Sequence, residues 1–131
     1  MWSRFYRRTM TASLSPAQIE YLTSQRLGRL ATIRPDGSPQ NNPVGFRYNV
    51  ALGTIDIGGR DLGASQKFRN LAKDERVAFV VDDVKSEQPW EVRCLEIRGT
   101  AQALRDVEPF YPGLSPELIR ITPERVIAFG I

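Results

Sequence analysis

Residues 28–39 read GRLATIRPDGSP and set the expectation for the fold. Leu30 and Thr32 alternate with the residues between them, which is the period-two pattern of a strand that buries one face. Residues 35–38 then supply the proline, aspartate and glycine of a tight turn. We therefore predict a strand and a hairpin turn, with residues 39–50 returning as the second strand.

Outward from this hairpin, the pattern predicts further strands joined by short helices. Pro43 cannot donate to a strand ladder, so the second strand should have a break, a bulge or a free edge near residues 41–43. Gly99 should bend the long fifth strand, and the acidic pair Asp82 and Asp83 should end the fourth. The predicted strands cover residues 29–34, 39–50, 54–57, 77–81, 90–104 and 125–129, and the predicted helices lie at 16–25, directly after Ser65, and at 117–121.

Six strands with short helices describe a β-rich α+β domain. An open sheet of this size buries little apolar surface, so we expect a small closed or split β-barrel. Pattern alone leaves a β-sandwich as the alternative. Because the chain has no internal repeat and no linker, residues 1–131 should form a single domain.

The composition excludes several classes of function. The chain has no histidine, which excludes Ser-His-Asp and Cys-His catalysis, and with a single cysteine we expect no metal site. Cys94 cannot form an intramolecular disulfide, so a reducing compartment is expected and the predicted location is the cytoplasm. The longest apolar run, residues 77–81, falls far short of the roughly 20 residues that cross a bilayer, so we expect no membrane partner.

The net charge of +3 comes entirely from the first nine residues. Arg4, Arg7 and Arg8 account for it, while the rest of the chain carries 15 basic and 15 acidic side chains. Residues 1–9 are either a non-native or disordered extension ahead of Met10 or a basic arm. Since backbone binding to nucleic acid needs a clustered basic surface, the balanced remainder predicts no nucleic-acid partner.

One basic segment suits an anion such as phosphate. Gly58 and Gly59 end a strand, and Arg60, Ser65 and Lys67 follow at the start of a short helix. Lysine and arginine side chains, a hydroxyl and unpaired backbone amides are the donors that a phosphate needs. The competing interpretation is an ordinary solvated face of an amphipathic helix.

The order of these segments resembles the pyridoxamine 5'-phosphate oxidase-like split-barrel family, and within it the small flavin- and deazaflavin-dependent reductases, many of which use coenzyme F420. The resemblance runs from about Leu14 to the end of the chain. It is carried by GRLATI at 28–33, DGSPQ at 36–40 and SQKFRNLAKDERV at 65–77.

The resemblance implies a homodimer of split barrels that binds FMN or F420 in two clefts at the subunit interface. It implies that the second strand lies along the ring system, and that the basic residue before the helix, Lys67, binds the phosphate. The expected cofactor-binding residues are Asn42, Pro43, Val44, Gly45, Ile57, Gly58, Arg60, Ser65, Gln66 and Lys67.

Two departures from the family pattern decide the expected cofactor. Asn42 and Gln66 stand where typical FMN proteins of the family have arginines, which favours F420 and leaves FMN as the alternative. True pyridoxamine phosphate oxidases are longer and use a C-terminal arginine- and histidine-bearing segment, so vitamin B6 oxidation is not expected.

The expected reaction is hydride transfer from reduced F420 to a small conjugated acceptor, with the cofactor rather than a catalytic side chain doing the chemistry. The alternatives are an FMN-dependent reductase and a non-catalytic carrier of the cofactor or of haem. Cys94 should pack as a small hydrophobe. The candidate substrate-pocket residues are Phe46, Tyr48, Trp90 and Arg93.

Overall fold

The computed structural model describes residues 12–131, so the predictions for residues 1–9 lie outside the described part of the chain. Ser15 begins the first helix as predicted, because its hydroxyl accepts from the Gln18 amide in a capping box and Pro16 occupies the first turn. The elements are α2 (Pro16–Ser24), β1 (Leu27–Ile33), β2 (Pro39–Asn49), β3 (Thr54–Gly58), η1 (Leu62–Ala64), α3 (Gln66–Asn70), β4 (Arg76–Glu87), β5 (Trp90–Arg105) and β6 (Glu117–Phe129).

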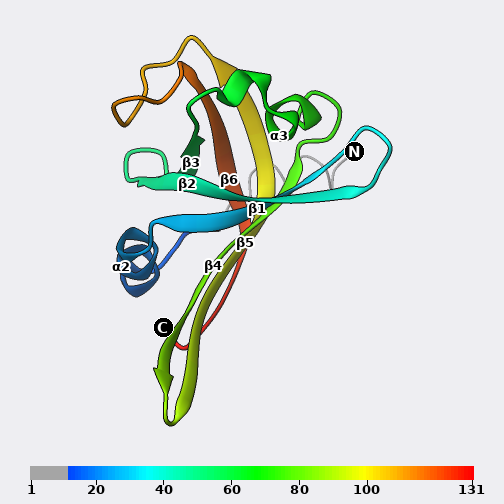
Figure 1. Cartoon of the computed structure of the whole chain (residues 1–131). Helices are drawn as coiled ribbons and strands as arrows, with labels where there is room; N and C mark the ends of the chain where they lie inside the picture. The colour runs from blue at the N-terminus through cyan, green and yellow to red at the C-terminus, as the bar shows by residue number, and fades with distance from the viewer. Residues whose placement is uncertain (1–11) are drawn as a thin grey trace.

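The six strands form a closed barrel in the order β1-β2-β3-β6-β5-β4, and all neighbours are antiparallel. Leu30 of β1 pairs with Phe79 of β4, and this short ladder closes the ring. The predicted barrel is therefore confirmed over the sandwich. The β4–β5 hairpin continues past the rest of the barrel as a long two-stranded ribbon (Figure 1).

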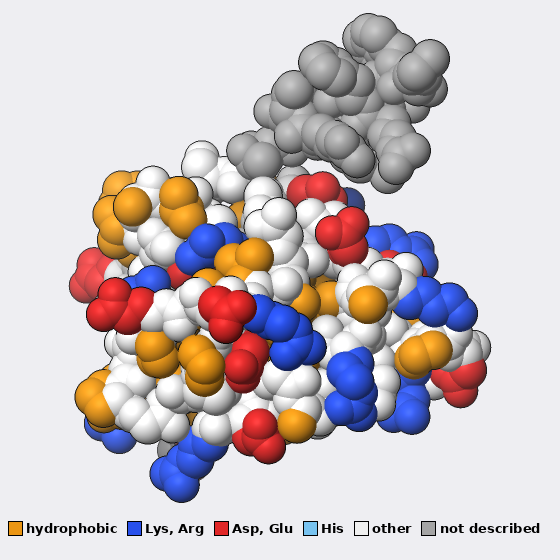
Figure 2. Space-filling view, turned by 90° about the horizontal axis from the view of Figure 1, so that it is seen from above, with side chains coloured by type: hydrophobic (Ala, Val, Ile, Leu, Met, Phe, Trp, Pro, Cys, Tyr) orange, Lys and Arg blue, Asp and Glu red, His pale blue; other side chains and the backbone are white. Residues whose placement is uncertain are grey.

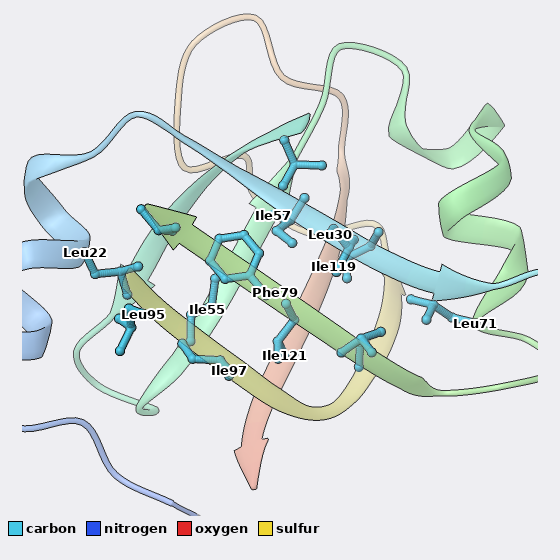
Figure 3. Packing of buried hydrophobic residues seen from close by; sticks show 14 of the residues in the cluster. Leu22, Leu30, Ile55, Ile57, Leu71, Phe79, Leu95, Ile97, Ile119 and Ile121 are labelled. Carbon is cyan, nitrogen blue, oxygen red and sulfur yellow. The ribbon is translucent and has the colours of Figure 1, made fainter. Parts of the chain in front are cut away.

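The core fills the inside of this ring. Figure 3 shows Leu30, Ile57, Phe79, Ile97 and Ile121 pointing toward one another from different strands. All five belong to the same buried cluster. Each fully buried aliphatic or aromatic side chain contributes roughly 1.5–3 kcal/mol. The period-two alternation of the sequence is thus the alternation between the barrel interior and its surface.

The strand β2 has two different halves. Pro39 to Val44 pair with β1 alone, Gly45 pairs with both β1 and β3, and Phe46 to Asn49 pair with β3 alone. Pro43 keeps the regular register opposite Arg29. Of the three alternatives predicted near residues 41–43, the structure therefore shows the free edge, where a missing amide donor is tolerated.

The strand β4 does not end at Asp82 and Asp83 as predicted, but continues to Glu87. The reason is that both carboxylates have cationic partners on neighbouring strands. Asp82 pairs with Arg29 of β1, and Asp83 pairs with Arg93 of β5 at 2.5 Å. Cross-strand ion pairs of this kind allow an acidic pair to remain inside a ladder.

The predicted helix at 117–121 is wrong, because these residues begin β6. Ser115 and Glu117 look like the start of a helix in the sequence, but they act on another segment. The Ser115 hydroxyl accepts from the Leu62 amide and the Glu117 carboxylate accepts from the Gly63 amide, each at 3.0 Å. They therefore cap η1 from the start of β6, which is the strand next to β3, and residues 117–121 are free to pair with β3 and β5.

The predicted bend in the fifth strand is confirmed. The register between β5 and β6 shifts between Arg98 and Gly99. A Cβ atom at Gly99 would collide with the Thr122 carbonyl, so the close approach of the two backbones at this bulge requires glycine. Within residues 12–131, neither of the α-helices has the length or apolar character to cross a bilayer.

Candidate functional site

The predicted ring-binding residues lie where β2 meets β3. Gly45 of β2 pairs directly with Gly58 of β3. The side chains of Val44 and Ile57 are buried in the core, so only their backbones are available to a ligand. Pro43 and Gly45 are exposed, and a Cβ placed on Gly45 would meet nothing within 4 Å. The structure thus provides an open surface along the outer face of β2.

A pocket of about 520 Å³ adjoins this surface. It brings together the predicted residues Gly45, Phe46 and Gly58 with residues that the sequence did not identify. These are Gln25, Arg26, Phe110, Tyr111 and Leu114. The only signal for the last three in the sequence was an aromatic pair inside a proline-rich loop, which periodicity does not interpret.

The loop of residues 106–116 forms one wall of this pocket, and it is fixed to the barrel. A Cβ on Gly58 would lie 2.7 Å from Leu114 and 3.2 Å from Phe110, so the loop packs directly on that glycine. The Arg47 guanidinium lies 4.8 Å from the centre of the Phe110 ring, a cation–π contact. The hydroxyl of Ser115 donates to the Gly59 carbonyl at 3.0 Å.

The predicted phosphate-binding segment contains two cations without an acidic partner among the described residues. Arg60 is exposed and Lys67 is half-buried, and neither is in an ion pair within residues 12–131. Ser65 is engaged as the cap of α3, since its hydroxyl accepts from the Phe68 amide and donates to the Leu62 carbonyl. Figure 2 shows basic and acidic side chains interspersed on the described part of the upper face.

A chain of side-chain amides connects α3 to β2, and we call it the amide chain. Its members are Gln66, Asn70, Gln40 and Asn42. Gln66 donates to Asn70 at 2.7 Å, Asn70 donates to Gln40 at 3.1 Å, and Gln40 donates to Asn42 at 2.8 Å. Asn70 is completely buried and donates its other N–H to Thr32 at 2.9 Å. Two predicted site residues, Asn42 and Gln66, therefore stand at the two ends of one hydrogen-bonded chain.

A second polar group, which we call the Asp56 cluster, joins side chains of β2, β3 and β6. Asp56 is fully buried. It accepts from Thr54 and Asn49 at 2.9 Å, from Arg120 at 3.1 and 3.3 Å, and from Arg47 at 3.4 Å. Burial opposes ionisation of Asp56, but the hydrogen bonds from Arg120, Asn49 and Thr54 outweigh it and hold its pKa below the usual range.

The four candidate substrate-pocket residues separate in the structure. Phe46 lines the pocket and contacts Phe79 edge to face at 5.1 Å, and Tyr48 packs against the core. Trp90 is exposed at the end of the β4–β5 hairpin. Arg93 is bound to Asp83 and stacks on the Tyr21 ring at 5.0 Å, away from the residues that line the pocket.

Tyr21 and Cys94 have shifted acidities with a structural origin. Burial raises the pKa of Tyr21, and its hydrogen bond to Asp83 at 2.9 Å raises it further. Burial also raises the pKa of the Cys94 thiol, as does the nearby Glu96 carboxylate. Both groups therefore stay protonated at neutral pH. Cys94, predicted to pack as a small hydrophobe, is half-buried in β5.

Comparison with known proteins gives a family match and relatives. Residues 14–128 match the family model for pyridoxamine 5'-phosphate oxidase. A 5a,11a-dehydrotetracycline/5a,11a-dehydrooxytetracycline reductase from Streptomyces rimosus subsp. rimosus is 50% identical over 115 residues, which are 87% of this chain and 81% of the reductase.

Solved structures share the fold. A conserved hypothetical protein from Mycobacterium tuberculosis superimposes with a TM-score of 0.71 at 24% identity, covering 94% of this chain and 88% of that one. An F420 reductase superimposes with a TM-score of 0.62 at 24% identity, covering 82% of this chain and 94% of that one. The six-stranded split barrel expected from the sequence is therefore confirmed.

Proposed function

The chain belongs to the pyridoxamine 5'-phosphate oxidase family, and on that basis we propose that it is an oxidoreductase that reduces a conjugated acceptor with a flavin-type cofactor, F420 in preference to FMN. The observation that carries the proposal is the 50% identity to a reductase over 87% of this chain. The fold supports it, since an F420 reductase is built on the same barrel.

The surface of β2 fits the planar ring of such a cofactor. Gly45 leaves open space above the strand, and Pro39 to Val44 have no strand partner other than β1 among the described residues. Backbone groups on a free strand edge are available to hydrogen-bond a ligand. The residues that would hold the ring are Asn42, Pro43, Val44, Gly45, Ile57 and Gly58, with Val44 and Ile57 contributing backbone atoms.

Lys67 and Arg60 would hold the phosphate end. Both cations lie between β3 and the end of α3, and neither is neutralised by a carboxylate within residues 12–131. A charge-assisted hydrogen bond from lysine to phosphate is about twice as strong as a neutral one. Gln66 would complete this end through its backbone amide, because its side chain already has partners. Ser65 would stand beside the phosphate as the cap of α3, since its hydroxyl and its backbone amide both bond to the Leu62 carbonyl.

The pocket beside Gly45 would take the acceptor. When bound, the reduced cofactor supplies the hydride, so the protein needs no catalytic side chain of its own. Phe46, Phe110, Tyr111 and Leu114 give the pocket an apolar, partly aromatic wall that stacks on a planar molecule and excludes water. We propose a polycyclic conjugated ketone as the acceptor class, because the 50% identical relative is a dehydrotetracycline reductase.

The proposal includes a homodimer with the cofactor cleft at its interface. Pro43 and Gly45 are exposed in the single chain, and a second copy would cover the outer side of the cleft that they form. Sedimentation velocity at micromolar concentration is expected to give a dimer. A monomer at all concentrations that support activity would contradict this part.

Titration of the purified protein with F420 and with FMN tests the cofactor. We expect saturable quenching of cofactor fluorescence at micromolar concentration, tighter for F420. Tight binding of FMN alone would show that the cofactor is FMN and not F420. Absence of saturable binding of either at tens of micromolar would contradict the proposal.

An acceptor panel tests the reaction. Reduced F420 should be oxidised in the presence of a dehydrotetracycline faster than with simple quinones or enones, and Tyr111→Ala should lower kcat/KM for the polycyclic acceptor more than for the simple ones. Tight cofactor binding without turnover of any acceptor would favour a carrier instead of an enzyme.

A further inference from the structure

The hydrogen bonds of the amide chain can run from donor to acceptor in one direction only, and Arg69 sets that direction. The Arg69 guanidinium donates to the side-chain oxygen of Gln66 at 2.9 Å and also to the Ala64 carbonyl. A guanidinium has donors and no acceptor, so Gln66 must present its oxygen to Arg69. Its NH₂ group must then face the other way, toward Asn70.

This constraint passes along every amide in turn. Gln66 donates to Asn70, so Asn70 turns its NH₂ group toward Gln40, and Gln40 turns its own NH₂ group toward Asn42. Reversal of any one amide would place two donors or two acceptors face to face. Asn70 is completely buried, so such a mismatch there carries the full penalty of an unsatisfied polar group.

The amide chain ends at Asn42, whose NH₂ group has no hydrogen-bond partner among the described residues. The Asn42 oxygen is occupied by Gln40, and its NH₂ group donates to no described residue. Asn42 is half-buried on β2, three residues or about 10 Å before Gly45, and its side chain lies on the opposite face of the strand from Pro43 and Gly45. Its NH₂ group can therefore meet a bound ring at the free edge of β2, where residues 39–44 have no partner from β3. Its NH₂ group is therefore a donor whose direction has been fixed from α3.

We propose that Arg69 and the amide chain present the Asn42 NH₂ group as a hydrogen-bond donor to a carbonyl oxygen of the ring bound on β2. The inference rests on the proposed function, since flavin and deazaflavin rings carry carbonyl oxygens at one edge. In this arrangement Asn42 touches the ligand, and Gln40, Asn70 and Arg69 are positioning residues that act through it. The same chain holds α3, which carries Lys67, at a fixed place relative to the ring-binding strand.

The variant Gln40→Glu tests the direction of the chain. A carboxylate at position 40 accepts from both neighbours, so Asn42 must turn its NH₂ group inward and its oxygen outward. We expect the dissociation constant of the bound cofactor to rise about tenfold or more, since a donor to the ring is replaced by an acceptor.

The matched control is Asn41→Asp, which adds the same charge one residue away and outside the chain. It is expected to change the dissociation constant by less than about threefold. Equal effects of Gln40→Glu and Asn41→Asp on a wild-type protein that binds cofactor would overturn the inference and leave the proposed function standing. A wild-type protein that binds neither F420 nor FMN would overturn both.

A second readout needs no ligand. Hydrogen exchange of the Asn42 side-chain NH₂ group, followed by NMR, should be fast in the wild type and in Asn41→Asp, where the group faces solvent. It should slow in Gln40→Glu, where the group is bonded to the carboxylate. Unchanged exchange in Gln40→Glu would show that the chain does not set the orientation of Asn42.

The role of Arg69 is tested by Arg69→Met with Arg69→Lys as the conservative partner. Riboflavin is the probe, because it has the ring without the phosphate and removes any direct effect of charge at position 69. Arg69→Met should weaken riboflavin binding several-fold, and Arg69→Lys, which keeps a donor without an acceptor, should restore it. Equal riboflavin affinity in Arg69→Met and the wild type would remove Arg69 from the inference.

Discussion

The Asp56 cluster and the amide chain both place polar side chains against β2, but only the amide chain ends in a polar group that has no hydrogen-bond partner among the described residues. In the cluster, four side chains converge on the two oxygens of one buried carboxylate. In the amide chain, each neutral group passes its hydrogen bond to the next, and the last NH₂ group has no partner among residues 12–131.

This difference distinguishes polar groups that stabilise the barrel from polar groups that can bind a ligand. A charge buried with all its lone pairs occupied has nothing to offer a ligand, and its removal leaves Arg120 uncompensated. A neutral chain open at one end costs less to bury, and it can direct a donor at something outside itself. We expect stability to depend on the first and ligand affinity on the second.

The largest effect is expected from Asp56→Ala. Removing one partner of a buried, hydrogen-bonded ion pair costs about 3–5 kcal/mol, measured as the free energy of unfolding in urea. Glu91→Ala, which removes an exposed partner 4.0 Å from Lys85, is the control and should cost less than about 1 kcal/mol. If Asp56→Ala does not fold, Asp56→Asn should still fold and show a smaller loss of unfolding free energy.

The pH dependence of stability tests the Asp56 cluster in a second way. The pKa of Asp56 is lowered in the folded state, so its stabilisation is complete above the unfolded value of about 4 and is lost as the pH falls through the folded pKa. The unfolding free energy should therefore fall more steeply below pH 4 in the wild type than in Asp56→Asn. Parallel pH profiles would show that Asp56 is not stabilised by its cluster.

The next effect is expected from Lys67→Ala, on affinity and not on stability. Loss of a charge-assisted hydrogen bond should weaken F420 or FMN binding by about 1–3 kcal/mol, and riboflavin binding should be unaffected. Lys85→Ala removes the same charge on the β4–β5 hairpin and should leave the dissociation constant unchanged. Equal affinities for Lys67→Ala and the wild type would remove Lys67 from the site.

The smallest effect is expected from Thr32→Val. It removes the acceptor of one Asn70 N–H and should cost about 1 kcal/mol of unfolding free energy. The direction of the amide chain is set by Gln66 and Gln40, so the cofactor dissociation constant should stay within about threefold of the wild type. A large loss of affinity would show that Thr32, and not Arg69, orients Asn70.

The sequence predicted the barrel because its strands alternate between interior and surface. It failed where a residue acts outside its own segment. Ser115 and Glu117 have the pattern of a helix start, yet they cap η1, which lies more than 50 residues earlier in the sequence. Asp82 and Asp83 have the pattern of a strand end, yet arginines on adjacent strands hold them in the ladder.

The candidate site was predicted in two pieces that the sequence could not join. Asn42 and Gln66 were expected to bind the cofactor, but the two residues that link them, Gln40 of β2 and Asn70 of α3, are 30 residues apart in the sequence and meet only in the fold. One signal was present, since Asn70 lies among the apolar residues Phe68 and Leu71 of a short helix. A buried amide of that kind needs partners, and only the fold shows which ones.

The loop of residues 106–116 has a consequence for how such proteins diversify. Its two ends are held together by the hydrogen bond from the Val107 amide to the Pro116 carbonyl at 3.1 Å. The residues between these ends, apart from Ser115, which caps η1, can be exchanged or lengthened without changing the register of β5 or β6. Selection can therefore remodel the acceptor wall at Phe110, Tyr111 and Leu114 while the barrel and the ring-binding strand are inherited intact.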